Sequence, residues 1–153
     1  MGNWTVEGDT LSVAGGTGKQ VALTDYAGKL QTDYTLTATV TAISHGGFNT
    51  TGGIVFDYHD ANNFKCAVLR AGQGGWNIEE FKNGQIIEHA RVHDASMATA
   101  GTPHDVELHV HGSVAELWSG GTLKASHDFG EPLNDGRFGV TSDGGQPDFK
   151  LAM

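Results

Sequence analysis

The segment from Gly53 to Arg70 places the strongest constraint on what this chain can fold into. Two apolar runs, residues 54–56 and 66–69, lie on either side of the polar cluster Asp60–Asn63. Asp and Asn favour a turn because their short side chains bond nearby backbone amides and tolerate left-handed conformations. The apolar runs suit strands, and both faces of each strand carry apolar residues. We therefore predict a β-hairpin in the middle of a packed β-domain.

Length and composition are consistent with a single all-β domain covering residues 1–153. A chain of this length can bury a core without disulfides or metal. Its 23 glycines and 18% charged residues are typical of many short strands joined by tight turns. The single cysteine, Cys66, lies in an apolar run, which predicts a buried thiol and leaves the redox compartment undecided.

The charge balance limits the partners of the chain. With 9 basic against 18 acidic residues the formal net charge is −9, which argues against nucleic acid and leaves cations and neutral polar ligands open. No apolar run is long enough to cross a bilayer, and Met1–Trp4 has no features of a leader, so we expect no membrane insertion. The abrupt start suits either a cytosolic protein or a domain of a longer secreted polypeptide.

Further hairpins are predicted along the chain. Trp4–Val13 reads as two short strands around Gly8. Asn83–Gly84 is the dipeptide that a type I′ turn prefers, because both central residues need positive φ. That turn would place Glu79 opposite Glu88, a pair of like charges that requires either solvent or a bridging cation. We expect solvent to separate them.

Two other segments alternate polar and apolar residues. In Tyr34–Ile43 we expect the threonines to face outward. A turn at His111–Gly112 would join the next two strands, and residues 92–102 before them could form a loop, a short helix or an irregular crossing. The expected inner face comprises Val106, Leu108, Ala115 and Leu117, and the expected outer face comprises Glu107, His109, Glu116 and Trp118.

Eleven to thirteen short strands with regular turn signals predict an antiparallel β-sandwich. Four features then carry a family resemblance: Trp4-x-Val-x-Gly-Asp-x-Leu11, residues 53–65, the two strands around Gly112, and Asp135–Val140. Together they resemble the concanavalin A-like, laminin-G-like jelly-roll superfamily over nearly the whole chain. The likeness is closest to domains of large bacterial surface proteins with cadherin-like repeats and to non-catalytic modules of secreted glycoside hydrolases. It implies a concanavalin A-like jelly roll, a fold that hosts sugar binders, protein binders, structural modules and hydrolases.

Catalysis is not expected. A jelly-roll hydrolase of the laminarinase type would resemble a Glu-x-Asp-x-x-Glu strand, which the chain lacks. Glu107 and Glu116 could form a cross-strand carboxylate pair, with His109 as an acid or base. Solvated strands often carry such groups without any reaction. We therefore assign no catalytic residue.

Histidines and hard oxygen ligands are the two groups of candidate metal ligands in the sequence. Zinc is not expected, because no His-Glu-x-x-His motif occurs and His109 and His111 share a strand face only if Gly112 does not bend it. The resemblance implies structural calcium, which the superfamily often holds in loops. The candidate ligands are Asp57, Asp60, Asn62, Asp143 and Asp148. The cluster at Asp60 is also explained as a plain turn.

Sugar binding is expected to rest on exposed tryptophans. A sugar ring stacks its C–H face on an aromatic ring while nearby polar groups bond its hydroxyls. Trp76 follows a glycine-rich segment, and Trp118 shares the outer face with Glu107, His109 and Glu116. Each tryptophan could instead cap the sandwich edge. The resemblance implies that Trp4 lies in the core.

These patterns together predict a non-catalytic, lectin-like carbohydrate-binding module of an extracellular or cell-surface protein. We expect it to be part of a longer multidomain chain, with a glycan or polysaccharide as its partner. One alternative is a structural or adhesive spacer domain with structural calcium. The other is a glycan-processing enzyme.

Overall fold

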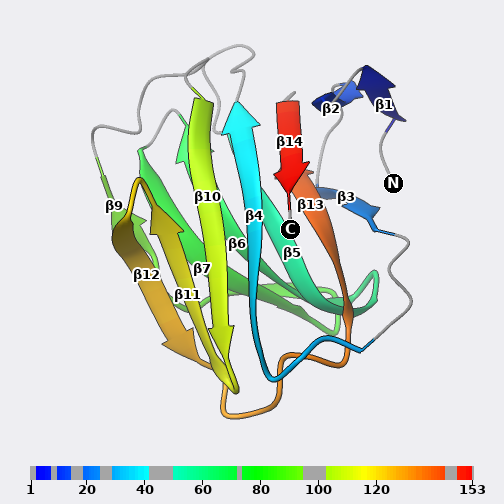
Figure 1. Ribbon diagram of the computed structural model, residues 1–153. Helices are drawn as coiled ribbons and strands as arrows, with labels where there is room; N and C mark the ends of the chain where they lie inside the picture. The colour runs from blue at the N-terminus through cyan, green and yellow to red at the C-terminus, as the bar shows by residue number, and fades with distance from the viewer. Residues whose placement is uncertain are drawn as a thin grey trace.

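The computed structural model describes residues 3–7, 10–14, 19–24, 29–41, 50–71, 74–94, 103–143 and 148–152. Side chains are described for residues 21–24, 29–40, 51–70, 74–94 and 103–142. These residues contain no helix, and hence none that is long and apolar enough to cross a membrane. Their strands form two antiparallel sheets stacked face to face, which confirms the predicted β-sandwich (Figure 1).

The first sheet has the strand order β1-β2-β14-β4-β10-β11-β12. Its strands are β1 (Asn3–Glu7), β2 (Thr10–Ala14), β14 (Asp148–Ala152), β4 (Asp33–Thr41), β10 (Pro103–His111), β11 (Val114–Ser119) and β12 (Thr122–Asp128). The second sheet has the order β3-β13-β5-β6-β7-β8, and β9 also pairs with β7. Its strands are β3 (Lys19–Leu23), β13 (Arg137–Asp143), β5 (Thr50–Asp60), β6 (Asn63–Ala71), β7 (Gly75–Lys82), β8 (Gln85–Glu88) and β9 (Val92–His93). Of the undecided segment 92–102, residues 95–102 lie outside the described residues.

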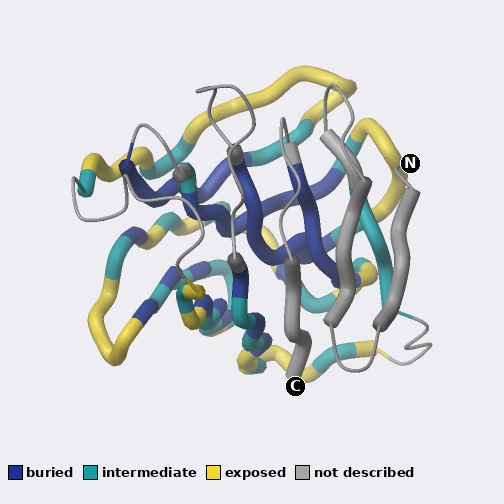
Figure 2. The backbone as a smooth tube through the Cα atoms, turned by 90° about the horizontal axis from the view of Figure 1, so that it is seen from above, coloured by how far each residue is buried: buried dark blue, intermediate teal, exposed yellow. Residues whose placement is uncertain are grey.

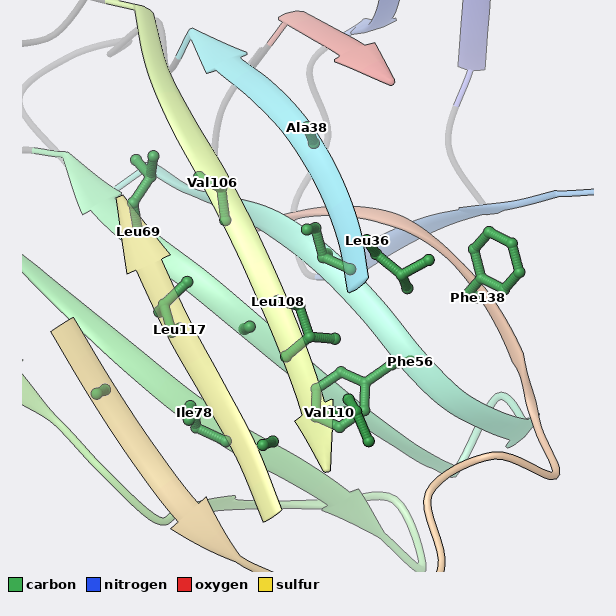
Figure 3. Packing of buried hydrophobic residues seen from close by; sticks show 14 of the residues in the cluster. Leu36, Ala38, Phe56, Leu69, Ile78, Val106, Leu108, Val110, Leu117 and Phe138 are labelled. Carbon is green, nitrogen blue, oxygen red and sulfur yellow. The ribbon is translucent and has the colours of Figure 1, made fainter. Parts of the chain in front are cut away.

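The main core lies between the two sheets. Alternate residues of β4 and β10 point inward, among them Leu36, Val40 and Leu108, and pack against Phe56 and Ile78 of the second sheet (Figure 3). Figure 2 shows the same arrangement along the backbone, with buried stretches in the strands and exposed ones at the turns. The alternation predicted for β4 is confirmed where side chains are described.

The predicted central hairpin is confirmed as β5 and β6, which occupy the middle of the second sheet. The turn between them is Ala61–Asn62. Its strands are buried on both faces, because a second cluster of Val55, Cys66 and Val68 lies on the side away from the main core. Cys66 is fully buried, as its position in the apolar run predicts.

The β7–β8 hairpin has the predicted turn. Both Asn83 (φ 52°) and Gly84 (φ 78°) have positive φ, and Glu79 pairs with Glu88. The expectation that solvent separates these two glutamates is wrong, because Glu79 is buried. The Arg70 guanidinium lies between them, with Nη2 2.7 Å from Glu88 Oε1 and 3.8 Å from Glu79 Oε2.

Replacing Gly84 with valine should lower the free energy of unfolding by about 1–2 kcal/mol, because a β-branched residue is strained at positive φ. Denaturant melts measure the change. Gln85→Val is the matched control, because position 85 is an exposed strand residue and should tolerate valine. Equal stability of the two variants would contradict a turn that requires glycine.

The turn between β10 and β11 is Gly112–Ser113, one residue later than predicted, because His111 pairs with Val114. The correction shifts the pairing by two residues along β11. Side chains alternate with a period of two, so the inner and outer faces stay as predicted. On the outer face Glu107 lies opposite Trp118, and His109 lies opposite Glu116.

Candidate functional site

A pocket of about 340 Å³ opens at one end of the sandwich. The loop that joins β12 to β13 crosses this end, at the bottom of Figure 1. The pocket is lined by Asp57 and His59 of β5, Asn63, Phe64 and Lys65 of β6, Glu80, Phe81 and Lys82 of β7, and Glu131, Pro132 and Asp135 of the loop. Its volume is at the lower end of the range for small-molecule sites.

An irregularity in β5 shapes the floor of this pocket. Regular pairing of β5 with β6 stops after Phe56 and resumes only at Asp60, and Asp57 within this bulge has φ 48°. Aspartate is one of the few residues that adopt this left-handed conformation readily. Gly136 of the loop lies against the Asp57 backbone, where a Cβ atom would come within 2.5 Å of the Asp57 carbonyl carbon. The loop can therefore dock here only through a glycine.

Lys65 is the centre of a buried ion cluster. Its ammonium lies 2.6 Å from Asp57 Oδ2, 3.1 Å from Glu131 Oε1 and 3.8 Å from Glu80 Oε2. Burial alone would lower the pKa of Lys65, but the hydrogen bond and charge of Asp57, followed by those of Glu131, raise that pKa above its usual value. Lys65 is therefore charged at neutral pH, and its carboxylate partners hold it in one position.

Neighbouring groups fix Asp57 and the loop. The His59 ring nitrogen Nε2 lies 2.9 Å from Asp57 Oδ1, so both carboxylate oxygens have partners. The Tyr34 hydroxyl donates a 2.7 Å hydrogen bond to the Leu133 carbonyl and so ties the loop to β4. Burial, and then the negative charge of Asp57, raises the pKa of Tyr34 well above its usual value, so the hydroxyl keeps its proton. The polar groups of the pocket are thus held in place by the fold.

Phe64 and Phe81 also line the pocket, on the other face of the second sheet from their strand neighbours Lys65 and Glu80. The rings of Phe64 and Phe81 stack at 4.7 Å with an angle of 7° between their planes. The lining carries four carboxylates against the ammonium groups of Lys65 and Lys82, an excess of negative charge that disfavours anionic ligands. Fixed charged groups that donate and accept hydrogen bonds suit a small neutral ligand with many hydroxyls.

The structure brings together four of the residues predicted for sugar binding, on the outer face of the first sheet. Glu107, His109, Glu116 and Trp118 are neighbours there. The His109 ring stacks on the Trp118 ring at 5.4 Å and 21°, and the Trp118 indole donates a 3.4 Å hydrogen bond to Glu116 Oε1. The ring face of Trp118 toward β10 is thus covered by His109. Sugar binding on this face stays a prediction.

The prediction that Trp76 is exposed is wrong. Trp76 is 1% exposed and belongs to the main core, because the alternation of β7 directs it inward together with Ile78. Its indole N–H contacts Asp94 Oδ2 at 3.3 Å, and the Lys124 ammonium lies 5.7 Å from its ring centroid. A ring enclosed in this way cannot stack on a sugar.

Two of the residues predicted to bind calcium have other partners. Asp57 is bound to the Lys65 ammonium, which occupies the position that a cation would take. Asp60 accepts hydrogen bonds from the Asn62 backbone at 2.8 Å and from the Asn63 side chain at 2.9 Å. Both bonds lower the pKa of Asp60, and the bond from the Asn62 backbone has the larger effect. Asp60 therefore acts as a turn residue, and Asn62 is a turn position beside it.

The two predicted groups of calcium ligands do not meet. Asp143 pairs with Thr51, six residues along β5 from Asp57, so their backbones are about 20 Å apart. Asp148 belongs to β14 in the other sheet. The side chains of Asp143 and Asp148 lie outside the described residues. This register separates Asp57 from Asp143, and calcium binding stays a prediction.

The residues that sequence reasoning missed are Lys65, Glu80 and Glu131. They are far apart in the chain and meet only through the pairing of β6 with β7 and the docking of the loop. One signal was available. Lys65 stands within an apolar run, between Phe64 and Cys66, where a charged residue requires a partner once it is buried.

Comparison with known proteins establishes the fold. No protein-family model matches the chain, and no curated protein matches it. Among solved structures it is similar to the carbohydrate-binding module CBM66 from Bacillus subtilis, with 18% identity and a TM-score of 0.84 over 99% of this chain and 90% of that one. It is also similar to sheep galectin-11 in complex with glycerol, with 13% identity and a TM-score of 0.60 over 92% and 97% of the two chains.

A third similar structure is a GH43 protein from Bacillus licheniformis, with 16% identity and a TM-score of 0.70. The match covers 97% of this chain and 33% of that one. At these identities the likeness shows the fold alone, an antiparallel jelly-roll β-sandwich, as the sequence predicted.

Proposed function

We propose that this domain is a non-catalytic carbohydrate-binding module and that the pocket at the end of the sandwich binds a neutral sugar. The observation that carries the proposal is the Lys65 ammonium held between Asp57 and Glu131 in a pocket of about 340 Å³. Solved structures of similar fold include a carbohydrate-binding module and galectins, which supports this class of function.

The pocket offers hydrogen-bonding groups to a sugar. Sugar hydroxyls are donors and acceptors, so they can donate to the Glu131 carboxylate and accept from the Lys82 ammonium. Because Asp57, Lys65 and Glu131 already hold one another, little side-chain order has to be gained on binding.

Binding without catalysis is favoured by the same cluster. An ammonium separates Asp57 from Glu131, so these two carboxylates are not an open acid and nucleophile facing a scissile bond. We further propose that the domain works outside the cell, as part of a longer multidomain chain that it anchors to a glycan or polysaccharide. The similar region of the GH43 protein makes up 33% of that longer chain, which supports such an attachment.

The test is a screen of the isolated domain on an array of neutral oligosaccharides and polysaccharides, followed by calorimetry with the best glycan. Glu131→Ala, in the pocket, should weaken binding by at least about tenfold, the loss expected when a hydrogen bond to a charged group is removed. Glu107→Ala is the matched control. It makes the same change of side chain on the outer face of the first sheet and should leave affinity unchanged.

The other outcomes are equally informative. Loss of binding with Trp118→Ala and Glu107→Ala, but not with Glu131→Ala, would move the glycan to the outer face and contradict the pocket. Absence of binding to every glycan would contradict the carbohydrate function and favour a structural or adhesive spacer. Release of reducing sugar from a bound glycan would contradict a non-catalytic role.

A further inference from the structure

We propose that the outer face of the first sheet binds zinc or a similar divalent transition metal through His109, His111 and Glu116. One ligand atom from each of the three side chains lies within 4.8 Å of the other two. The face is a different surface from the sugar pocket, and the two share no residue. This inference is therefore independent of the proposed function.

The strand register builds the site. His109 and His111 are two residues apart on β10, so they point to the same side of the sheet. The sequence left this open because of Gly112, but the chain turns only after His111 has paired with Val114. Glu116 of β11 lies directly opposite His109, and its Oε1 is 3.4 Å from Nε2 of His111. All three ligands thus come from one rigid hairpin.

The donor set suits borderline metals. Two imidazoles and one carboxylate can serve as the three protein ligands of a zinc ion, whose fourth coordination position then stays open to solvent. Ligand atoms around a tetrahedral zinc ion are about 3.4 Å apart, given metal–nitrogen distances near 2.0–2.1 Å. Small side-chain rotations bring atoms within 4.8 Å to that spacing, and the His111 side chain, 58% exposed, is free to make them.

Neighbouring groups would hold the ligands in place. Glu107 Oε2 lies 3.1 Å from Nε2 of His109, so a carboxylate fixes the orientation of that ring. The indole N–H of Trp118 does the same for Glu116 Oε1 at 3.4 Å. The two glutamates also give this face a negative charge that attracts a cation.

The test is calorimetric titration of the domain with Zn²⁺ alone, with Ca²⁺ and Mg²⁺ in parallel. We expect one Zn²⁺ per chain and no heat from the other two ions, whose preferred ligands are oxygens. His111→Gln and Glu116→Gln should each weaken Zn²⁺ binding by at least about tenfold, the minimum usually lost when even a supporting group is removed. His93→Gln removes an exposed histidine of the second sheet and is the matched control.

Tryptophan fluorescence places the ion. Because His109 stacks on Trp118, a paramagnetic ion at the site, Ni²⁺, should quench Trp118, and Trp118→Phe should remove that quenching while calorimetry still detects the ion. Thermal melts check that every variant folds. Three outcomes would overturn the site. Zn²⁺ could still bind the double variant His109→Gln/His111→Gln, His93→Gln could weaken Zn²⁺ binding as much as His111→Gln does, or the wild-type domain could bind no Zn²⁺ at millimolar concentration.

Discussion

Replacement of Lys65 by methionine should lower the free energy of unfolding by about 3–5 kcal/mol, the range measured when one member of a buried ion pair is removed. Methionine fills a similar volume, so the loss comes from charge. Asp57, with a 3% exposed side chain, would keep a buried carboxylate without the ammonium that now lies 2.6 Å away. Chemical denaturation at pH 7 measures the effect.

Two variants separate this effect from a general loss of charge. Lys82→Met changes an exposed lysine of the same pocket and should cost little. The double variant Asp57→Asn/Lys65→Met removes both charges, so it should recover part of the stability lost in Lys65→Met, and asparagine tolerates the φ of 48° at position 57. Equal stability of Lys65→Met and Lys82→Met would contradict a buried ion cluster.

The contribution of Lys65 also has a definite pH range. Its pKa in the folded chain lies above the ordinary value of 10.5. A group with a raised folded pKa contributes stability that is fully present below its unfolded pKa and is lost as pH rises through the folded value. The difference between wild type and Lys65→Met should thus be constant around neutrality and shrink only in strongly alkaline solution.

The sequence predicts the fold well because the patterns that specify strands are local. Alternation along β4 and β10, the Asn83–Gly84 turn and the polar turn between β5 and β6 each depend on a few consecutive residues. Even the misplaced turn at Gly112 left both faces correct, since a shift of two residues preserves the alternation. A shift by one residue would instead have exchanged the two faces.

The candidate pocket could not be predicted in the same way. Asp57, Lys65, Glu80 and Glu131 meet through long-range pairing and a bulge that no sequence motif announces. Burial was misjudged for a related reason. A tryptophan that follows a glycine-rich segment suggests an exposed ring. The pairing of Trp76 with Leu69 instead decides to which side of the sheet its side chain points, and that side is the core.

The second large effect concerns Trp76 and Trp118, whose replacement by alanine should destabilise the domain by very different amounts. Trp76→Ala should lower the free energy of unfolding by about 3–5 kcal/mol, because it leaves a large cavity in the main core. Trp118→Ala removes a half-buried ring and its stacking on His109, which should cost about 1 kcal/mol. Denaturant melts of the two variants give the comparison, and Trp76→Phe controls for partial refilling of the cavity.

The emission of each tryptophan provides a separate measurement. Both measurements use chains in which the third tryptophan, Trp4, is also replaced by phenylalanine. With Trp118 replaced by phenylalanine, the folded domain should keep blue-shifted emission from buried Trp76, which shifts to the red only when the chain unfolds. With Trp76 replaced by phenylalanine, acrylamide should quench Trp118 more readily, because that ring is half exposed. Similar costs for Trp76→Ala and Trp118→Ala, or easy quenching of Trp76 in the folded chain, would place Trp76 at the surface and return it to the list of sugar-binding candidates.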